Sequence, residues 1–188
     1  MANKVKFGLR NVYYSKMTVS GDTVSYATPV AMPGAVSLSG SPVGDSVDFN
    51  ADDIIYFQST ANQGYEGELE VALINENFLT DIMKLEKDSN GALVESADAI
   101  PESFALGFEI QGDKKPRRTW YYNCTCARPN NDAKTKETGI NPDTETLSIK
   151  MMPRGTDHKV KVTLELTDDN ESVYEDFFDS VYESSSSI

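Results

Sequence analysis

Apolar and polar residues alternate along short stretches of the chain, the pattern of β-strands that bury one face. The alternation is clearest in Val160, Val162, Leu164 and Leu166, which share one face. Gly, Pro, Asn and Asp separate these stretches, as expected of turns. We predict further strands at residues 5–19 (one strand or a broken pair), 35–39, 54–59, 64–73, 103–111, 118–127 and around 147–151.

Strands with one apolar face suit antiparallel sheets that pack face to face. In residues 118–127 we expect Trp120, Tyr122, Cys124 and Cys126 to share one face. The predicted fold class is therefore mainly β with one or two short helices, as an antiparallel β-sandwich or half-barrel.

Two segments change to helical spacing. In residues 77–87 the apolar positions form one stripe, and Asn90-Gly91 is a plausible end signal. In residues 172–183 Ser172 and Glu175 have capping-box spacing. The apolar sides of the two helices are formed by Phe78, Leu79, Ile82, Met83 and Leu85, and by Tyr174, Phe177, Phe178 and Val181.

Two long segments, residues 39–53 and 128–143, are rich in Gly, Pro, Asn and Asp and have few apolar anchors. Loops of this length are often functional. The serine-rich residues 184–188 are expected to form a flexible tail. We therefore expect one domain, residues 1–183, followed by that tail.

The charge is strongly negative: 188 residues carry a formal net charge of −13, with a pI near 4.4. This charge disfavours non-specific binding of nucleic acid through its phosphates. The sequence contains neither an apolar stretch long enough to cross a bilayer nor the apolar core of a signal peptide. We therefore expect a soluble protein made in the cytosol, without a membrane span.

Part of this charge lies on a single strand face. Glu66, Glu68 and Glu70 alternate with Tyr65, Leu69 and Val71 at a period of two. Like charges along one face repel each other and add nothing to a core, so we expect this acidic face to have a function.

No residue pattern predicts a catalytic, cofactor or metal site. His158 is the single histidine and has no nucleophile motif beside it. Cys124 and Cys126 are too few for a structural zinc site and are expected to be reduced, buried thiols. The pairs Asp52-Asp53 and Asp168-Asp169 lack the spacing of a cation site.

A basic cluster, Lys114, Lys115, Arg117 and Arg118, follows the turn signal at Gln111-Gly112-Asp113 and precedes aromatic residues. Cations beside aromatic side chains can bind nucleic acid, but a charged hairpin tip is the simpler interpretation. A third interpretation is that this basic tip pairs with the acidic surface of a neighbouring copy.

Several segments, taken in order, resemble the major tail protein, or tail tube protein, of long non-contractile-tailed bacteriophages, especially those of Gram-positive hosts. These segments are Lys4-Val-Lys-Phe-Gly-Leu-Arg-Asn-Val-Tyr-Tyr, Pro33-Gly-Ala-Val-Ser-Leu-Ser, Gly64-Tyr-Glu-Gly-Glu-Leu-Glu, Phe78-Leu-Thr-Asp-Ile-Met, Phe104-Ala-Leu-Gly-Phe-Glu-Ile and Trp120-Tyr-Tyr-Asn. The resemblance covers almost the whole chain.

This resemblance implies a non-enzymatic virion protein, assembled in the host cytoplasm as hexameric rings that stack into the tail tube. The implied partners are other copies of the chain, the tape measure protein, and the tail terminator and distal tail proteins, with viral DNA passing through the lumen without specific binding. The resemblance implies that residues 39–53 form the loop between rings, with Val43, Asp45, Val47, Phe49 and Asp52 as its candidate contacts.

Glu66, Glu68 and Glu70 are then candidates for the lumen lining or for a surface between subunits that pairs with the basic tip. Two alternatives remain. One is a related tail terminator or distal tail protein. The other is an adhesin-like or carbohydrate-binding β-sandwich, which would need an exposed aromatic platform with Trp120 and Tyr122 as its candidates.

Overall fold

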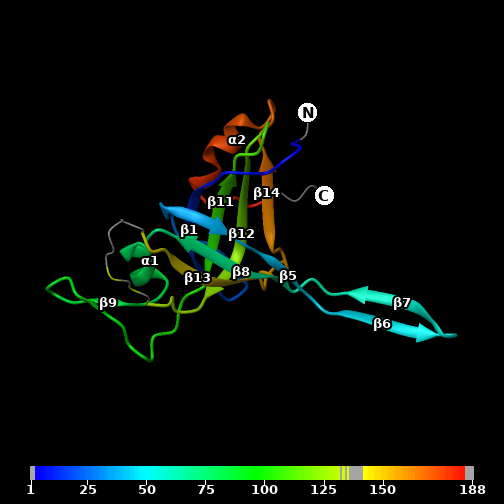
Figure 1. The fold of residues 1–188 in the computed structure, drawn as a ribbon, viewed down its shortest axis with the longest axis horizontal. Coiled ribbons are helices and arrows are strands. Elements are labelled where there is room, and N and C mark those ends of the chain that lie inside the picture. The colour runs from blue at the N-terminus through cyan, green and yellow to red at the C-terminus, as the bar shows by residue number, and fades with distance from the viewer. Residues whose placement is uncertain (1–2, 132, 134, 136–141, 185–188) are drawn as a thin grey trace.

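The predicted fold class is confirmed: the protein is mainly antiparallel β with two short α-helices (Figure 1). The computed structural model describes residues 3–131, 133, 135 and 142–184. Part of the predicted loop 128–143 and the end of the serine-rich tail lie outside these residues. Within them, one large antiparallel sheet has the strand order β2-β1-β11-β12-β13-β8-β4, with β14 paired to β12, β3 to β1 and β5 to β8.

The strands of this sheet are β1 (Leu9–Ser20), β2 (Thr23–Tyr26), β3 (Val30–Ala31), β4 (Ala35–Leu38), β5 (Ser41–Val43), β8 (Gly64–Val71), β11 (Phe104–Ile110), β12 (Arg117–Cys126), β13 (Glu145–Met152) and β14 (Lys161–Glu165). Two separate hairpins are formed by β6 (Ser46–Ala51) with β7 (Ile54–Thr60), and by β9 (Glu86–Lys87) with β10 (Leu93–Val94). The helical elements are α1 (Glu76–Asp81), α2 (Glu171–Glu175) and the 3-10 turn η1 (Asp176–Phe178).

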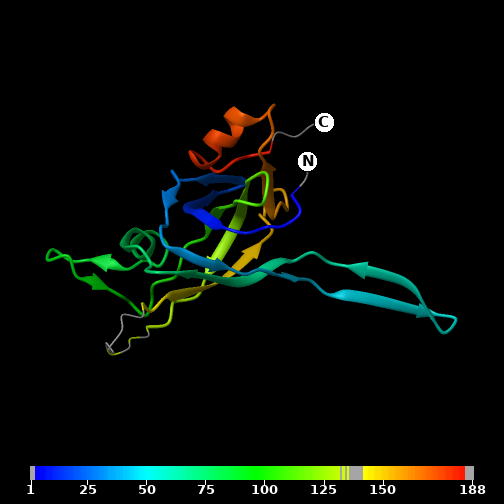
Figure 2. The same cartoon turned by 45° about the horizontal axis from the view of Figure 1, so that its top comes forward.

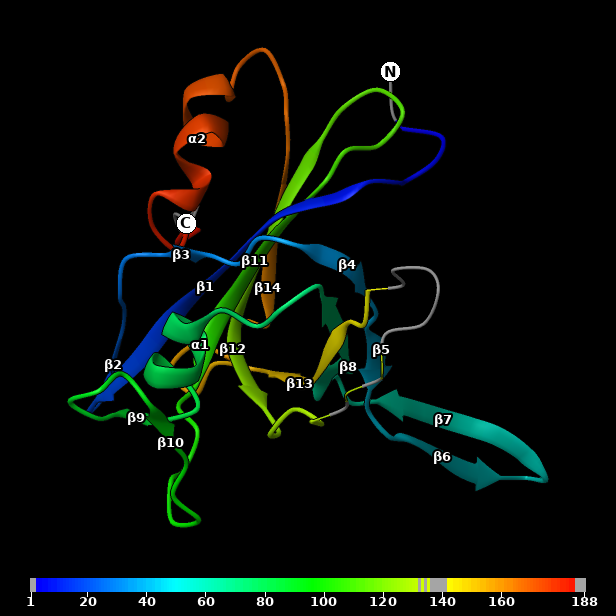
Figure 3. The same ribbon diagram turned by 60° about the vertical axis from the view of Figure 1, so that its left-hand side comes forward.

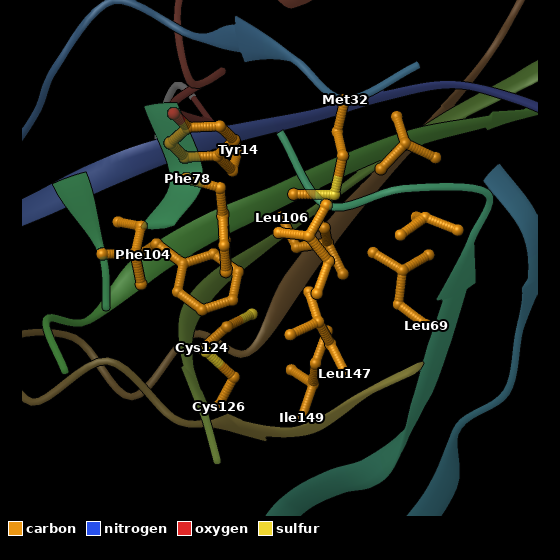
Figure 4. Close-up of a cluster of buried hydrophobic side chains, with 14 of the residues drawn as sticks. Tyr14, Met32, Leu69, Phe78, Phe104, Leu106, Cys124, Cys126, Leu147 and Ile149 are labelled. Atoms are coloured by element: carbon orange, nitrogen blue, oxygen red, sulfur yellow. The ribbon is translucent and has the colours of Figure 1, made fainter. Parts of the chain in front are cut away.

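The main core lies inside the curve of the large sheet, and α1 covers it (Figure 3). Phe78 of α1 packs edge-to-face against Tyr14 and Phe104, with ring centroids 5.0 and 5.4 Å apart. Leu69, Leu147 and Ile149, together with the two cysteines, enter the same interior from β8, β13 and β12 (Figure 4). The cysteines are thus free and buried, as predicted.

A second core lies on the other side of β11 and β12, under α2 and η1. Trp120 and Tyr122 belong to it with Ala105, Phe177, Phe178 and Val181, whereas Cys124 and Cys126 belong to the main core. The prediction that all four β12 residues share one face was therefore wrong. A β-bulge opposite Phe104–Leu106 adds one residue to β12 and changes which face the following side chains occupy.

Both predicted helices are shorter than their apolar stripes. Asn75 caps α1 through its side-chain oxygen, which accepts a hydrogen bond from the Phe78 amide at 2.9 Å, but the helix ends at Asp81. Lys84 then has a φ of 62°, and the chain enters β9 instead of continuing the helix. Asn90-Gly91 is the turn between β9 and β10, not a helix end.

The predicted capping box of the second helix was also wrong. Asn170 occupies the N-cap position without a side-chain cap bond, because its oxygen accepts from the Thr167 amide, and Ser172 lies inside α2. The expected apolar side is nevertheless buried. Trp120 Nε1 donates to the Phe177 carbonyl at 2.9 Å, so this segment is fixed to the sheet by packing and hydrogen bonds.

Arg154 fixes the last described turn of the chain. Its side chain is buried, forms ion pairs with Asp157 and Glu183, and lies 4.5 Å from the centroid of the Tyr122 ring. Hydrogen bonds to Asp157 and Glu183 raise the pKa of Arg154, and the hydrogen bond from Arg154 lowers the pKa of Asp157. Both groups therefore stay charged near neutrality.

Candidate functional site

The most conspicuous surface feature is a β-hairpin that projects from the body (Figures 1 and 2). We call residues Ser46–Thr60, which form β6 and β7, the arm. The sequence predicted β7 but assigned 39–53 to a loop, and that assignment was wrong. Asp52 and Asp53 connect the strands with φ values of 52° and 62°, the geometry of a two-residue type I′ turn.

One face of the arm is apolar and uncovered. Phe49 pairs directly with Phe57, and Ala51 with Ile54, so these four residues share a face. Phe49, Ile54 and Phe57 are 59%, 62% and 60% exposed. The arm therefore holds apolar side chains in water, which marks it as an interaction surface.

The arm is a continuous extension of the sheet. β5 pairs with β8, and the ladder continues outward because the Ala61 amide donates to the Asp45 carbonyl at 3.0 Å. A Cβ atom at Gly44 would overlap the Ala61 carbonyl oxygen. Gly64 has a φ of +107°, and a Cβ atom there would overlap the carbonyl oxygen of Met151. Glycine at both positions allows the ribbon to leave the body.

The five candidate contacts assigned to residues 39–53 are distributed along this ribbon. Val43 lies in β5, within the large sheet, and is partly buried, while Asp45 is exposed at the junction. Val47 pairs with Ser59 in the arm, Phe49 lies on the apolar face and Asp52 is in the turn. Sequence reasoning missed Ile54 and Phe57, because an apolar run resembles a buried core strand.

The acidic residues of β8 lie on a broad polar sheet face. Glu66, Glu68 and Glu70 are opposite Lys150, Ser148 and Thr146 of β13, and Ser41 and Ser37 are opposite Glu66 and Glu70 on the other side. We call these eight residues the polar face. It is the outer side of the strands that contribute Leu69 and Leu147 to the main core.

Two small hydroxyl groups stabilise the charged form of Glu70. Thr144 donates a hydrogen bond to Glu70 Oε1 at 2.6 Å, and Ser37 donates to Oε2 at 2.9 Å. These two bonds lower the pKa of Glu70. Lys150, directly opposite Glu66, is the single cation among the eight residues. With three glutamates and one lysine, the polar face is therefore acidic, and Glu66 and Glu68 are exposed on it.

The four basic residues of the predicted tip do not act as one group. Arg118 Nε donates to Glu109 Oε2 at 2.8 Å, and Arg118 also lies over the Tyr174 ring at 4.2 Å. Arg117 pairs with Glu165 at 2.6 Å. Arg117 and Arg118 are thus held by acids of their own subunit, and Lys114 and Lys115 occupy the β11–β12 turn.

Glu109, the partner of Arg118, is almost completely buried and also pairs with Arg10 at 2.5 Å. Burial acts to raise the pKa of Glu109, but the hydrogen bonds and charges of Arg118 and Arg10 lower it overall. The ionised carboxylate of Glu109, in β11, therefore links this strand to β1 through Arg10 and to β12 through Arg118.

The remaining residues that were considered for catalysis or metal binding do not form a site. Burial raises the pKa of the Cys126 thiol to about 12, so it stays protonated. His158 lies in a turn, with a φ of 57°. Among the residues that the structure describes, no group of three or more His, Cys, Asp and Glu side chains could hold a metal ion.

Trp120 and Tyr122 are both fully buried. They cannot form the exposed aromatic platform that the carbohydrate-binding alternative required of them.

In the described part of the chain, no helix is both long and apolar enough to cross a membrane. Comparison with models of known protein families and with curated proteins found no match to this chain.

Proposed function

We propose that this protein is a structural subunit that assembles with itself into hexameric rings stacked as a hollow tube, the tail tube of a long non-contractile-tailed bacteriophage. The observation that carries the proposal is the arm, whose apolar face is exposed on a single copy. Burying that face against another copy removes it from water, which favours association. The sequence resemblance described above supplies the class of assembly.

The polar face fits the lining of a conduit for DNA. A tube that passes duplex DNA must not bind it, and carboxylates repel phosphates over roughly 8–10 Å at physiological salt. Glu66, Glu68 and Glu70 lie on the outer side of the sheet and stay in contact with water. In this proposal the tape measure protein occupies the lumen before DNA, and the terminator and distal tail proteins bind the two ends.

In this proposal the protein resides in the virion tail after assembly in the host cytoplasm. A terminator or distal tail protein would use a similar fold but would stop at a single ring. Negative-stain microscopy of the concentrated protein distinguishes the two. We expect stacked rings with sixfold class averages and a pore at least as wide as duplex DNA. Monomers at every concentration would refute the proposal, and rings that never stack would favour the terminator or distal tail role.

The role of the polar face has its own test. Replacing Glu66, Glu68 and Glu70 by Gln should preserve the fold, because none of the three is buried. If the face lines the conduit, tubes form normally and DNA ejection from particles that carry the variant is impaired. If the face lies between subunits, rings fail to form. Normal assembly with normal ejection would exclude both roles.

A further inference from the structure

The arm restricts the chemistry of whatever covers it. Phe49, Ile54 and Phe57 form an apolar face, and residues 45–60 carry Asp45, Asp48, Asp52 and Asp53 with no Lys or Arg. A matching surface must provide an apolar floor with cations at its edge, since unpaired acids at an interface are costly.

The same chain has such a surface at its N-terminal end. A hollow between the N-terminal segment and the open end of the curved sheet is lined by Lys6, Phe7, Leu38, Tyr65, Tyr121 and Lys161, among others. We call it the N-terminal hollow. Phe7 is 55% exposed there, and Lys161 Nζ lies 4.4 Å from the centroid of the Tyr65 ring. No arm residue lines this hollow, so the arm does not fill it within one copy.

Hydrogen bonds hold the edge of the hollow in place. Asn3 Nδ2 donates to the Lys115 carbonyl at 2.7 Å, and the Lys4 amide donates to Asp113 Oδ1 at 2.8 Å. The Gly112 amide donates to the Phe7 carbonyl at 3.2 Å. Four lysines, Lys4, Lys6, Lys114 and Lys115, are carried by this pair of segments, with Asp113 as the acid among them.

We propose that the arm of one copy docks in the N-terminal hollow of a second copy. The proposal rests on the self-assembly proposed above and names the surface that receives the arm. Phe49 and Phe57 pack on Phe7, Leu38 and the tyrosines, while Asp45 at the junction and the turn residues Asp52 and Asp53 face Lys4, Lys6 and Lys161. Asp48 pairs with Gln58 and lies on the other face of the arm. Because arm and hollow are different surfaces, each copy gives one arm and receives one, which allows the contact to repeat from copy to copy.

Zero-length cross-linking tests the contact directly. A carbodiimide joins a carboxylate to an amine only where the two touch. In an assembled equal mixture of ¹⁴N- and ¹⁵N-labelled protein, we expect mixed-isotope cross-links from Asp45, Asp52 or Asp53 to Lys4, Lys6 or Lys161. Mixed-isotope links from the arm to Lys150 of the polar face, with none to the hollow, would overturn this proposal and leave the proposed tube intact.

Charge exchange provides the second test. Asp45→Lys reverses an arm charge without changing the turn, and Lys4→Glu with Lys6→Glu reverses the hollow. Either change alone should weaken association roughly tenfold or more. An equimolar mixture of these two variants should form arm-to-hollow pairs between a reversed arm and a reversed hollow. Asp22→Lys, in the exposed β1–β2 turn, is the matched control and should associate like the wild type.

The outcomes separate this proposal from the proposed function. Assembly that is insensitive to both reversals refutes docking in the hollow but not the tube. Reversals that weaken assembly without rescue in the mixture also refute it, since they would reflect general charge effects. A wild-type protein that stays monomeric and forms no intermolecular links refutes both proposals.

Discussion

Replacing the two paired phenylalanines on the apolar face of the arm should strongly weaken association while leaving the subunit folded. The perturbation is the double substitution Phe49→Ser with Phe57→Ser, which changes two directly paired residues. Fully burying one such side chain contributes about 1.5–3 kcal/mol. Because the two are 59% and 60% exposed in a single copy, an interface that covers them gains about 1–2 kcal/mol from each.

The pair therefore contributes about 2–4 kcal/mol to each contact, and each 1.4 kcal/mol is a factor of about ten in the dissociation constant. The double variant should associate roughly 30-fold to several-hundred-fold more weakly in sedimentation velocity over a concentration series. The free energy of unfolding should fall by less than about 1 kcal/mol, since the monomer loses little more than one cross-strand pair.

The matched control is Ile100→Ser, which removes an apolar side chain that is 82% exposed and lies outside the arm. It should associate like the wild type. If the double variant associates within about twofold of the wild type, burial of the arm does not drive assembly, and the reasoning fails. If both variants lose association equally, exposed apolar area in general, and not the arm, is responsible.

Three further predictions concern the subunit itself. Because the pKa of Glu109 is lowered on folding, its contribution to stability is present above the unfolded pKa of about 4.3 and is lost as the pH falls. Glu109→Gln, which leaves Arg118 without its carboxylate, should cost about 2–4 kcal/mol at pH 7 and flatten the loss of stability below about pH 5 in urea titrations; an unchanged acid slope contradicts this. Cys126 should resist iodoacetamide at pH 8 in the native state and react in urea, as read by mass spectrometry; rapid native labelling contradicts its burial. Gly64→Ala should cost at least about 2 kcal/mol by calorimetry, with Gly155→Ala, which has open space, as the neutral control; equal melting temperatures would refute the steric argument.

The alternation of apolar residues was sufficient to predict the body of the fold. It located β4, β7, β8, β11, β12 and β13 to within a few residues, because the period of two is a local property of the chain. The bulge in β12 was not predictable in this way. One extra residue places Cys124 on the opposite face of the sheet from Tyr122. Nothing in the local sequence signals this bulge.

The arm overlaps the segment that the sequence marked as a long loop, but its hairpin form was not predicted. The turn at Asp52-Asp53 and the alternation of Val47, Phe49 and Ala51 were signals of a hairpin that composition obscured. The exposure of Ile54 and Phe57 could not be predicted, because burial depends on what the rest of the chain places against a strand. Likewise, the pairing of Arg118 with Glu109 depends on the register between β11 and β12.

The arm and the polar face require opposite environments. Apolar side chains held in water are unfavourable, so the arm face favours any state that excludes water from Phe49 and Phe57. The carboxylates of Glu66 and Glu68 would lose hydration if they were covered, so the polar face disfavours contact with an apolar partner. A single copy leaves the polar face in water but does not exclude water from the arm. In the tube that we propose, arms buried between copies and polar faces around a wet channel satisfy both requirements, so the two surfaces are consistent with that assembly.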